Sequence, residues 1–195
     1  MLRDSSNPRS IGRGLWWVGV CALSWCAVVM GWSRIYQVAG GRELDQKIAA
    51  VSKNRRPDPP LVPAPGSVIG RLVISRLGVS AIAYEGVEDT LLRMAVGHIP
   101  GTALPPEMGN AAFAAHRDTF FRNLDHLHRN DAIRLTSPSG TFLYRVEWSA
   151  VVKPEATWVL EPTGSGSLTL VTCYPFHYVG PAPLRFVVRA RLVES

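Results

Sequence analysis

An uncharged, apolar stretch near the N-terminus constrains this chain more than any other feature of its sequence. Residues 14–33 have the sequence GLWWVGVCALSWCAVVMGWS, twenty positions without a charged side chain. About 20 apolar residues in a helix cross the hydrocarbon core of a bilayer. Trp16, Trp17 and Trp32 lie near the ends of the stretch, and indole rings favour the headgroup level. The sequence therefore predicts one transmembrane signal-anchor over residues 14–33.

A cleaved signal peptide is the alternative to an uncleaved anchor. The apolar core of a signal peptide is shorter, about 7–15 residues, and is followed by a small-x-small cleavage site. The stretch Val-Ala-Gly at 38–40 lies close behind the apolar segment but fits such a site poorly. We therefore favour the uncleaved anchor.

Positive charge is concentrated around this segment. Residues 1–65 carry a net charge of +5, whereas residues 66–195 carry +1. The basic excess lies where it can meet anionic headgroups, so we expect the membrane as a partner and no nucleic acid. Three arginines within 1–13 favour a cytoplasmic N-terminus, although Arg34 and Arg42 weaken that bias. The domain after the anchor is thus expected on the outer face of the cell membrane, extracellular or periplasmic.

Residues 34–65 are expected to join the anchor to a separate domain, residues 66–195. Apolar residues at helical spacing predict a short stalk helix over 43–56. The run PDPPLVPAP follows at 57–65, and its five prolines resist both helix and sheet. Such a run behaves as a semi-rigid spacer, which would hold the domain away from the bilayer.

Most of the domain is expected to form short strands separated by turn residues. The expected strands cover residues 68–75, 79–84, 110–115, 132–136, 142–152, 168–172 and 184–193. Short helices are expected at 88–95 and 122–127. Many short strands in one small domain favour a closed or nearly closed β-barrel over a βαβ arrangement. The predicted fold class is therefore mainly β.

Cys173 is the only cysteine outside the membrane segment, which holds Cys21 and Cys26. An unpaired cysteine in an exported domain is either an intermolecular link or a reactive thiol. An inert core position is the alternative, because free cysteine is among the most buried residue types. The apolar strand 168–172 ends at Cys173, and Pro175 then interrupts regular pairing. Since a strand end can present a side chain to a cleft, Cys173 is the candidate nucleophile.

A cysteine nucleophile needs a cationic neighbour, because the thiolate attacks and an unperturbed thiol is mostly protonated at neutral pH. His116 follows the apolar run 111–115 and precedes polar residues, so it is also expected at a strand end. Arg185 lies among apolar strand residues, where a guanidinium tends to be paired or functional. An Arg185 that simply points outward on an alternating strand is the alternative, and the sequence supports the two interpretations equally. Arg189 and Arg191 alternate on what is expected to be an exposed face.

The remaining histidines and acids have ordinary explanations. His98 is expected in a loop before Pro100, and His177 in a loop after Cys173. His126 and His128 form a His-x-His pair without a third ligand at convincing spacing. The acids within 85–89 are interpreted as a solvated turn. We therefore predict no metal and no cofactor.

Three segments together resemble motifs of the sortases. TLVTCYPF at 169–176 is similar to the sortase cysteine motif, and APLRFVV at 182–188 to its arginine strand. GHIPGTALPPEMGNAAFAAHRDTFF at 97–121 is similar to the histidine region. The resemblance covers essentially all of 66–195 and is nearest to small single-anchor sortases of class D or E. It implies a closed eight-stranded sortase β-barrel.

The resemblance also implies a mechanism. Cys173 would be the nucleophile, His116 its catalytic partner and Arg185 the third essential group, while Thr172 would support the substrate pocket. Cys173 would cleave a sorting signal resembling Leu-Pro-x-Thr-Gly in exported proteins, forming a thioester. An amine on a cell-wall precursor or another protein would then accept the acyl group. Asp118 is close to His116 in sequence but is equally well explained as a loop residue.

Two alternatives stay open. The same site could act as a cysteine hydrolase with water as the acceptor. A non-enzymatic, membrane-tethered barrel with a buried Cys173 could instead bind ligands.

Overall fold

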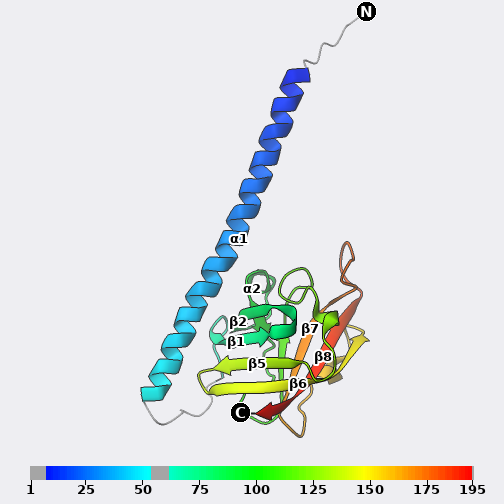
Figure 1. Ribbon diagram of the computed structural model, residues 1–195. Coiled ribbons are helices and arrows are strands. Elements are labelled where there is room, and N and C mark those ends of the chain that lie inside the picture. The colour runs from blue at the N-terminus through cyan, green and yellow to red at the C-terminus, as the bar shows by residue number, and fades with distance from the viewer. Residues whose placement is uncertain (1–7, 54–61, 195) are drawn as a thin grey trace, which may run out of the picture.

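A long N-terminal helix and a closed β-barrel make up the molecule (Figure 1). The computed structural model describes residues 8–53 and 62–194. The helix is α1 (Pro8–Lys53). The strands are β1 (Val68–Ile74), β2 (Val79–Glu85), β3 (Val96–His98), β4 (Asn110–Ala114), β5 (Ala132–Ser137), β6 (Gly140–Val152), β7 (Ser167–Tyr174) and β8 (Leu184–Glu194). The short helices are η1 (Ser75–Leu77), α2 (Asp89–Leu92), η2 (Leu124–His126) and η3 (Thr157–Leu160).

The barrel closes in the strand order β1-β2-β3-β4-β7-β8-β6-β5, with β5 pairing back onto β1. The β2–β3 and β4–β7 pairs are parallel, and the other pairs are antiparallel. Closure leaves no strand edge exposed for pairing with another chain. The prediction of a mainly β, eight-stranded barrel is confirmed. The short strand β3 was not predicted, because three residues carry too little alternation to be recognised.

Alternating side chains of the strands separate the inside of the barrel from its outer face. Leu168 and Leu170 of β7 are fully buried in the core, together with Val188 and Ala190 of β8. The intervening residues of both strands point the other way, since successive side chains of a strand alternate between faces. Cys173 and Arg185 therefore belong to the outer face.

The second half of α1 packs against the outer face of β1 and β2. The rings of Tyr36 and Tyr84 stack with centroids 4.8 Å apart, and Tyr84 donates a hydrogen bond to the Tyr36 carbonyl at 3.2 Å. Burial raises the pKa of Tyr84 well above its ordinary value, so its hydroxyl remains a donor. Gln37 Nε2 donates to Met94 O at 2.8 Å, and Gln37 Oε1 accepts from Ile82 N at 2.7 Å. The helix is thus bound to the barrel both by the stacked rings of Tyr36 and Tyr84 and by the hydrogen bonds of Gln37.

These contacts correct two expectations about residues 34–65. The stalk helix expected over 43–56 is the last part of α1, which continues without a break to Lys53. The barrel is not held away from the apolar segment 14–33, because Gln37 of α1 binds β2 only four residues after that segment ends. Most of the proline-rich run at 57–65 lies outside the described residues.

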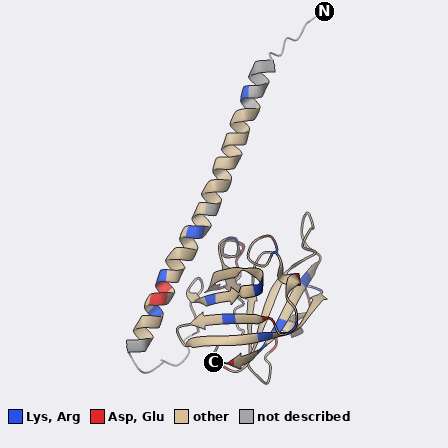
Figure 2. Cartoon of the chain, in the orientation of Figure 1, with Lys and Arg blue, Asp and Glu red and all other residues tan. Residues whose placement is uncertain are grey.

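The first half of α1 carries no charged residue between Arg13 and Arg34 (Figure 2). Among the described residues, α1 is the one helix long and apolar enough to cross a membrane. The side chains of Trp16, Trp17 and Trp32 are exposed along it. Such a surface suits contact with lipid.

Gly40→Ala is expected to weaken the contact between α1 and the barrel. A Cβ at this position would lie 2.0 Å from Tyr84 Oη, so the buried ring would have to move. Overpacking of this kind costs about 1–3 kcal/mol, which exceeds the gain of about 1 kcal/mol from replacing a helical glycine. Hydrogen exchange of the Ile82 amide, measured on the full chain in detergent, should become faster.

Gly31→Ala is the matched control, because no atom lies within 4 Å of its added Cβ. It should leave the Ile82 amide protected. If both variants keep that protection, the packing of α1 on β2 does not depend on the close approach at Gly40.

Candidate active site

Strand register brings three sequence-predicted residues together on the outer face. Ala114 of β4 pairs with Val171 of β7 in a parallel ladder, and continuing that register two residues past the end of β4 brings His116 level with Cys173. Cys173 pairs directly with Arg185 of β8 in an antiparallel ladder. Each of the three side chains is half-buried. By this register, a row of histidine, cysteine and arginine runs from just beyond the end of β4 across β7 to β8, with the thiol in the middle.

Backbone contacts continue this alignment beyond the end of β4. Ala115 N donates to Val171 O at 3.3 Å. Thr172 Oγ1 donates to Ala115 O at 2.8 Å, and Thr172 is only 3% exposed. The hydroxyl of Thr172 thus ties the residue before His116 to the residue before Cys173. In this structure Thr172 supports the site from the barrel side.

Arg185 has part of its guanidinium committed and part of it free. Its Nη1 donates to Ala182 O at 3.2 Å and to Leu184 O at 2.9 Å. Its Nε and Nη2 make no hydrogen bond to any residue within 8–53 or 62–194. The two carbonyls fix the position of the cation, and the remaining N–H groups are available to an oxygen atom near Cys173.

The acid beside His116 is Asp89 of α2, which the sequence did not identify. His116 Nε2 lies 3.4 Å from Asp89 Oδ1, and the Asp89 side chain is 61% exposed. The other carboxylate oxygen of Asp89 accepts from Arg93 Nε at 2.9 Å. Asp118 is exposed, and only its backbone carbonyl is used, by Arg122. Proximity in sequence was therefore a poor guide to the neighbour of His116.

Arg117 holds the loop that follows Cys173. Its Nη1 donates to Pro175 O at 2.9 Å, and its Nη2 donates to Tyr178 O at 2.7 Å and to Gly180 O at 3.1 Å. Its guanidinium also lies 5.8 Å from the centre of the Tyr178 ring. Arg117 follows His116 directly, so one short segment supplies the histidine of the row and the clamp for the β7–β8 loop.

The expectations that His98 lies in a loop and that Glu85 lies in a solvated turn are both wrong. His98 belongs to β3 and is 1% exposed, and Glu85 at the end of β2 is 4% exposed. His98 Nδ1 lies 2.6 Å from Glu85 Oε2, and its Nε2 lies 2.9 Å from Thr102 Oγ1. The Thr102 hydroxyl donates to Ile99 O at 2.7 Å, so His98 Nε2 is the donor of its own bond. This chain of bonds is internal and has a structural role.

Arg189 is a further correction, because it is buried rather than exposed. It is 7% exposed, and its Nη2 donates to Val159 O of η3 at 2.7 Å. Its guanidinium lies 5.5 Å from the centre of the Trp148 ring. Burial lowers the pKa of Arg189, and Glu147 partly offsets that effect. Alternation placed Arg189 on the outer face correctly, but η3 covers that part of the face.

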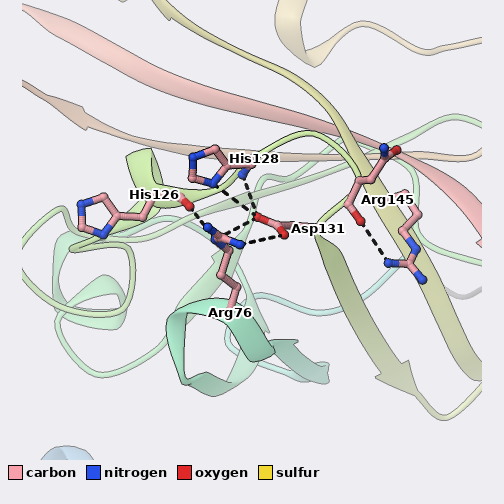
Figure 3. A network of polar contacts seen from close by, with 6 residues as sticks. Arg76, His126, His128, Asp131 and Arg145 are labelled. Carbon is pink, nitrogen blue, oxygen red and sulfur yellow. Dashed lines mark hydrogen bonds and ion pairs between the residues drawn. The ribbon is translucent and has the colours of Figure 1, made fainter.

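His126 and His128 belong to a polar network at another part of the barrel (Figure 3). Arg76 donates through Nε to His126 O at 3.0 Å and lies 3.2 Å from Asp131 Oδ2. The His128 backbone N–H donates to the same carboxylate oxygen at 2.7 Å. The network joins η1 to the turn before β5. In the described parts of the chain, no three histidines, cysteines or acids are grouped so as to hold a metal ion.

Comparison with known proteins identifies the class to which this fold and site belong. Residues 72–193 match the sortase domain family. The chain is 33% identical over 132 residues to Sortase D of Bacillus subtilis (strain 168), an alignment that covers 67% of each protein. This chain belongs to the sortase family.

Solved structures agree with this assignment. A Sortase D5 transpeptidase of Clostridium perfringens is 27% identical, with a TM-score of 0.68 over 81% of this chain and 98% of that one. Sortase C1 of Streptococcus agalactiae is also 27% identical, with a TM-score of 0.60 over 65% of this chain and 69% of that one.

His98→Ala is expected to destabilise the fold strongly, because it leaves the Glu85 carboxylate buried without its partner. Removing one member of a buried pair costs about 3–5 kcal/mol. Urea unfolding of the full chain would measure the loss. His126→Ala is the control, since the His126 side chain is exposed, and its effect should stay within about 0.5 kcal/mol. Equal losses in the two variants would contradict a structural role for the Glu85–His98 pair.

Proposed function

We propose that this sortase is a membrane-anchored cysteine transpeptidase with Cys173 as nucleophile, His116 as general acid and base, and Arg185 as the oxyanion-stabilising cation. The proposal is supported by the strand register, which pairs Cys173 with Arg185 and, continued two residues past the end of β4, brings His116 level with Cys173. A thiol flanked by an imidazole and a guanidinium can be held as the thiolate that attacks. The half-buried positions allow a peptide to reach the thiol.

In the first half of the proposed reaction, Cys173 Sγ attacks the carbonyl carbon of the scissile peptide bond. Negative charge then develops on the carbonyl oxygen, where the free N–H groups of Arg185 can donate. The C–N bond breaks as the His116 imidazolium transfers its proton to the leaving amine. The product is a thioester between Cys173 and the carboxyl end of the cleaved protein.

In the second half, an acceptor amine attacks the thioester carbonyl. Neutral His116 takes a proton from the attacking nitrogen, and the C–S bond breaks to release the Cys173 thiolate. The site returns to the thiolate and imidazolium with which it began. An amide bond has replaced the original peptide bond, so no external oxidant, reductant or cofactor is needed.

The proposed substrates are exported proteins with a sorting signal resembling Leu-Pro-x-Thr-Gly, and the proposed acceptor is an amine on a cell-wall precursor or a protein. These follow from the family resemblance of residues 97–121, 169–176 and 182–188. The apolar half of α1 supports a single-pass anchor, with residues 1–13 in the cytoplasm and the barrel on the outer face. Incubation with a signal peptide and excess amine separates transpeptidase from hydrolase. Formation of the free acid alone, without amide, would favour the hydrolase.

Cys173→Ser is expected to abolish both peptide cleavage and the thioester, because an alcohol at this position is not ionised at neutral pH. Intact-mass measurement of the full chain after incubation with signal peptide would detect the acyl-enzyme. His116→Ala should lower kcat/KM by about 10²–10⁴-fold, the usual contribution of general acid–base catalysis. Cys26→Ser changes a thiol in the membrane segment and should leave activity unchanged.

A thiol probe tests the non-catalytic alternative. If Cys173 stays unlabelled in the folded chain and His116→Ala retains full activity, Cys173 is not the nucleophile.

Asp89 is proposed as a positioning residue that orients His116 through the 3.4 Å contact with Nε2. Asp89→Asn should lower kcat severalfold, with little change in the KM of the peptide, because the imidazole loses a charged partner and substrate contacts remain. Asp89→Glu should restore part of the lost rate. Glu88→Gln is the matched control on the preceding, exposed position. If Asp89→Asn and Glu88→Gln lower kcat equally, Asp89 does not position His116.

A further inference from the structure

The β7–β8 loop, residues 175–183, is an exposed segment without a lysine, arginine or acid. Its sequence is PFHYVGPAP. The Val179 side chain is 99% exposed and Tyr178 is 45% exposed. Tyrosine is enriched at membrane–water interfaces, and an uncharged loop avoids the cost of removing charges from water. The composition of the loop is therefore suited to the edge of a bilayer.

The barrel lies close enough to the membrane for such a contact. Gln37, which binds Met94 and Ile82, is four residues beyond Ser33, the last residue of the apolar segment. Four residues of helix rise about 6 Å. The headgroup layer on each side of the hydrocarbon core is about 5–8 Å thick. A barrel docked at Gln37 thus touches or enters the headgroup layer.

A chain of contacts places the loop at the membrane-facing end of the barrel. Gln37 binds Met94, just after α2, and Asp89 of α2 contacts His116. Arg117 then binds the loop through three carbonyl groups. In Figure 1, the loop between β7 and β8 and the region of α2 extend toward the side on which the N-terminal half of α1 projects, whereas the C-terminus lies at the opposite end.

Arg117 also reduces the cost of moving this loop out of water. Carbonyl groups without a hydrogen bond are expensive to place in an apolar environment. The carbonyls of Pro175, Tyr178 and Gly180 already accept bonds from Arg117. The apolar side chain of Val179 can therefore leave water while the carbonyls of Tyr178 and Gly180 on either side of it keep a hydrogen-bond donor.

We propose that the β7–β8 loop is a membrane-contacting element, with Tyr178 and Val179 entering the headgroup layer of the bilayer that holds α1. The inference rests on the membrane anchoring in the proposed function. It adds a second attachment point on the side of Cys173, so that the thiol faces the bilayer surface. A signal peptide or an acceptor held in that membrane would then reach Cys173 without a large movement of the barrel.

The test uses the full chain in lipid nanodiscs, with an environment-sensitive fluorophore at position 179. The label is introduced as Val179→Cys after Cys21→Ser, Cys26→Ser and Cys173→Ser remove the native thiols. Emission should shift to shorter wavelength, and lipids with a nitroxide near the headgroup should quench it. Ser139→Cys in the same background is the control, in the exposed turn between β5 and β6. Quenching at position 179 should exceed that at position 139 severalfold.

A label on the native Cys26, with Cys21→Ser and Cys173→Ser, tests the anchor by itself. If Cys26 is quenched by lipids and position 179 behaves as in water, the loop inference is wrong and the anchor stands. If Cys26 is not quenched, the anchoring proposal fails, and the loop inference fails with it. If position 179 becomes shielded only after signal peptide is added, a protein substrate covers the loop instead of lipid, which also overturns the inference.

Discussion

The backbone hydrogen-bond ladder through β4, β7 and β8 is the constraint on which the candidate site depends. It pairs Cys173 with Arg185, and its Ala114–Val171 pair directs the segment that carries His116 toward them, although the three residues come from segments far apart in the chain. Slipping one strand by a single residue would move its side chains to the opposite face of the sheet. Cys173 would then enter the core in place of its apolar neighbours. The buried residues of β7, including Leu168 and Leu170, therefore hold the thiol outward by filling the inside.

The docking of α1 has a comparable effect on the position of the whole barrel. A flexible tether would let the domain sample many distances from the bilayer, whereas Gln37 and Tyr36 bind β2 directly. In the proposed membrane-anchored arrangement, the height of the barrel above the bilayer is set by this helix rather than by the proline-rich run. Gln37 binds Met94 just after α2, Asp89 of α2 contacts His116, and Arg117 binds the β7–β8 loop.

Residues that the sequence assigned wrongly share one physical cause. His98, Glu85 and Arg189 are polar, and polar residues in loops, in turns or on an alternating strand are usually exposed. Each is buried here because a non-local partner satisfies it: Glu85 and His98 bond to each other, and Arg189 bonds to a carbonyl of η3. The local sequence around a polar residue does not show whether a distant segment supplies such a partner. For a similar reason the prediction treated residues 43–56 as a separate stalk helix rather than as part of α1. The sequence does not show that α1 packs against β2.

The sequence by itself determined the apolar segment, most of the strands, the mainly β class and Cys173 as the one thiol outside the apolar segment. These are local properties, because they depend on composition and on the period of alternation within a few residues. Only the tertiary structure decided that Asp89 rather than Asp118 lies beside His116, that His98 is internal, and that α1 packs on the barrel. Those outcomes depend on pairing between distant segments, where burial and strand register select the neighbours of each side chain.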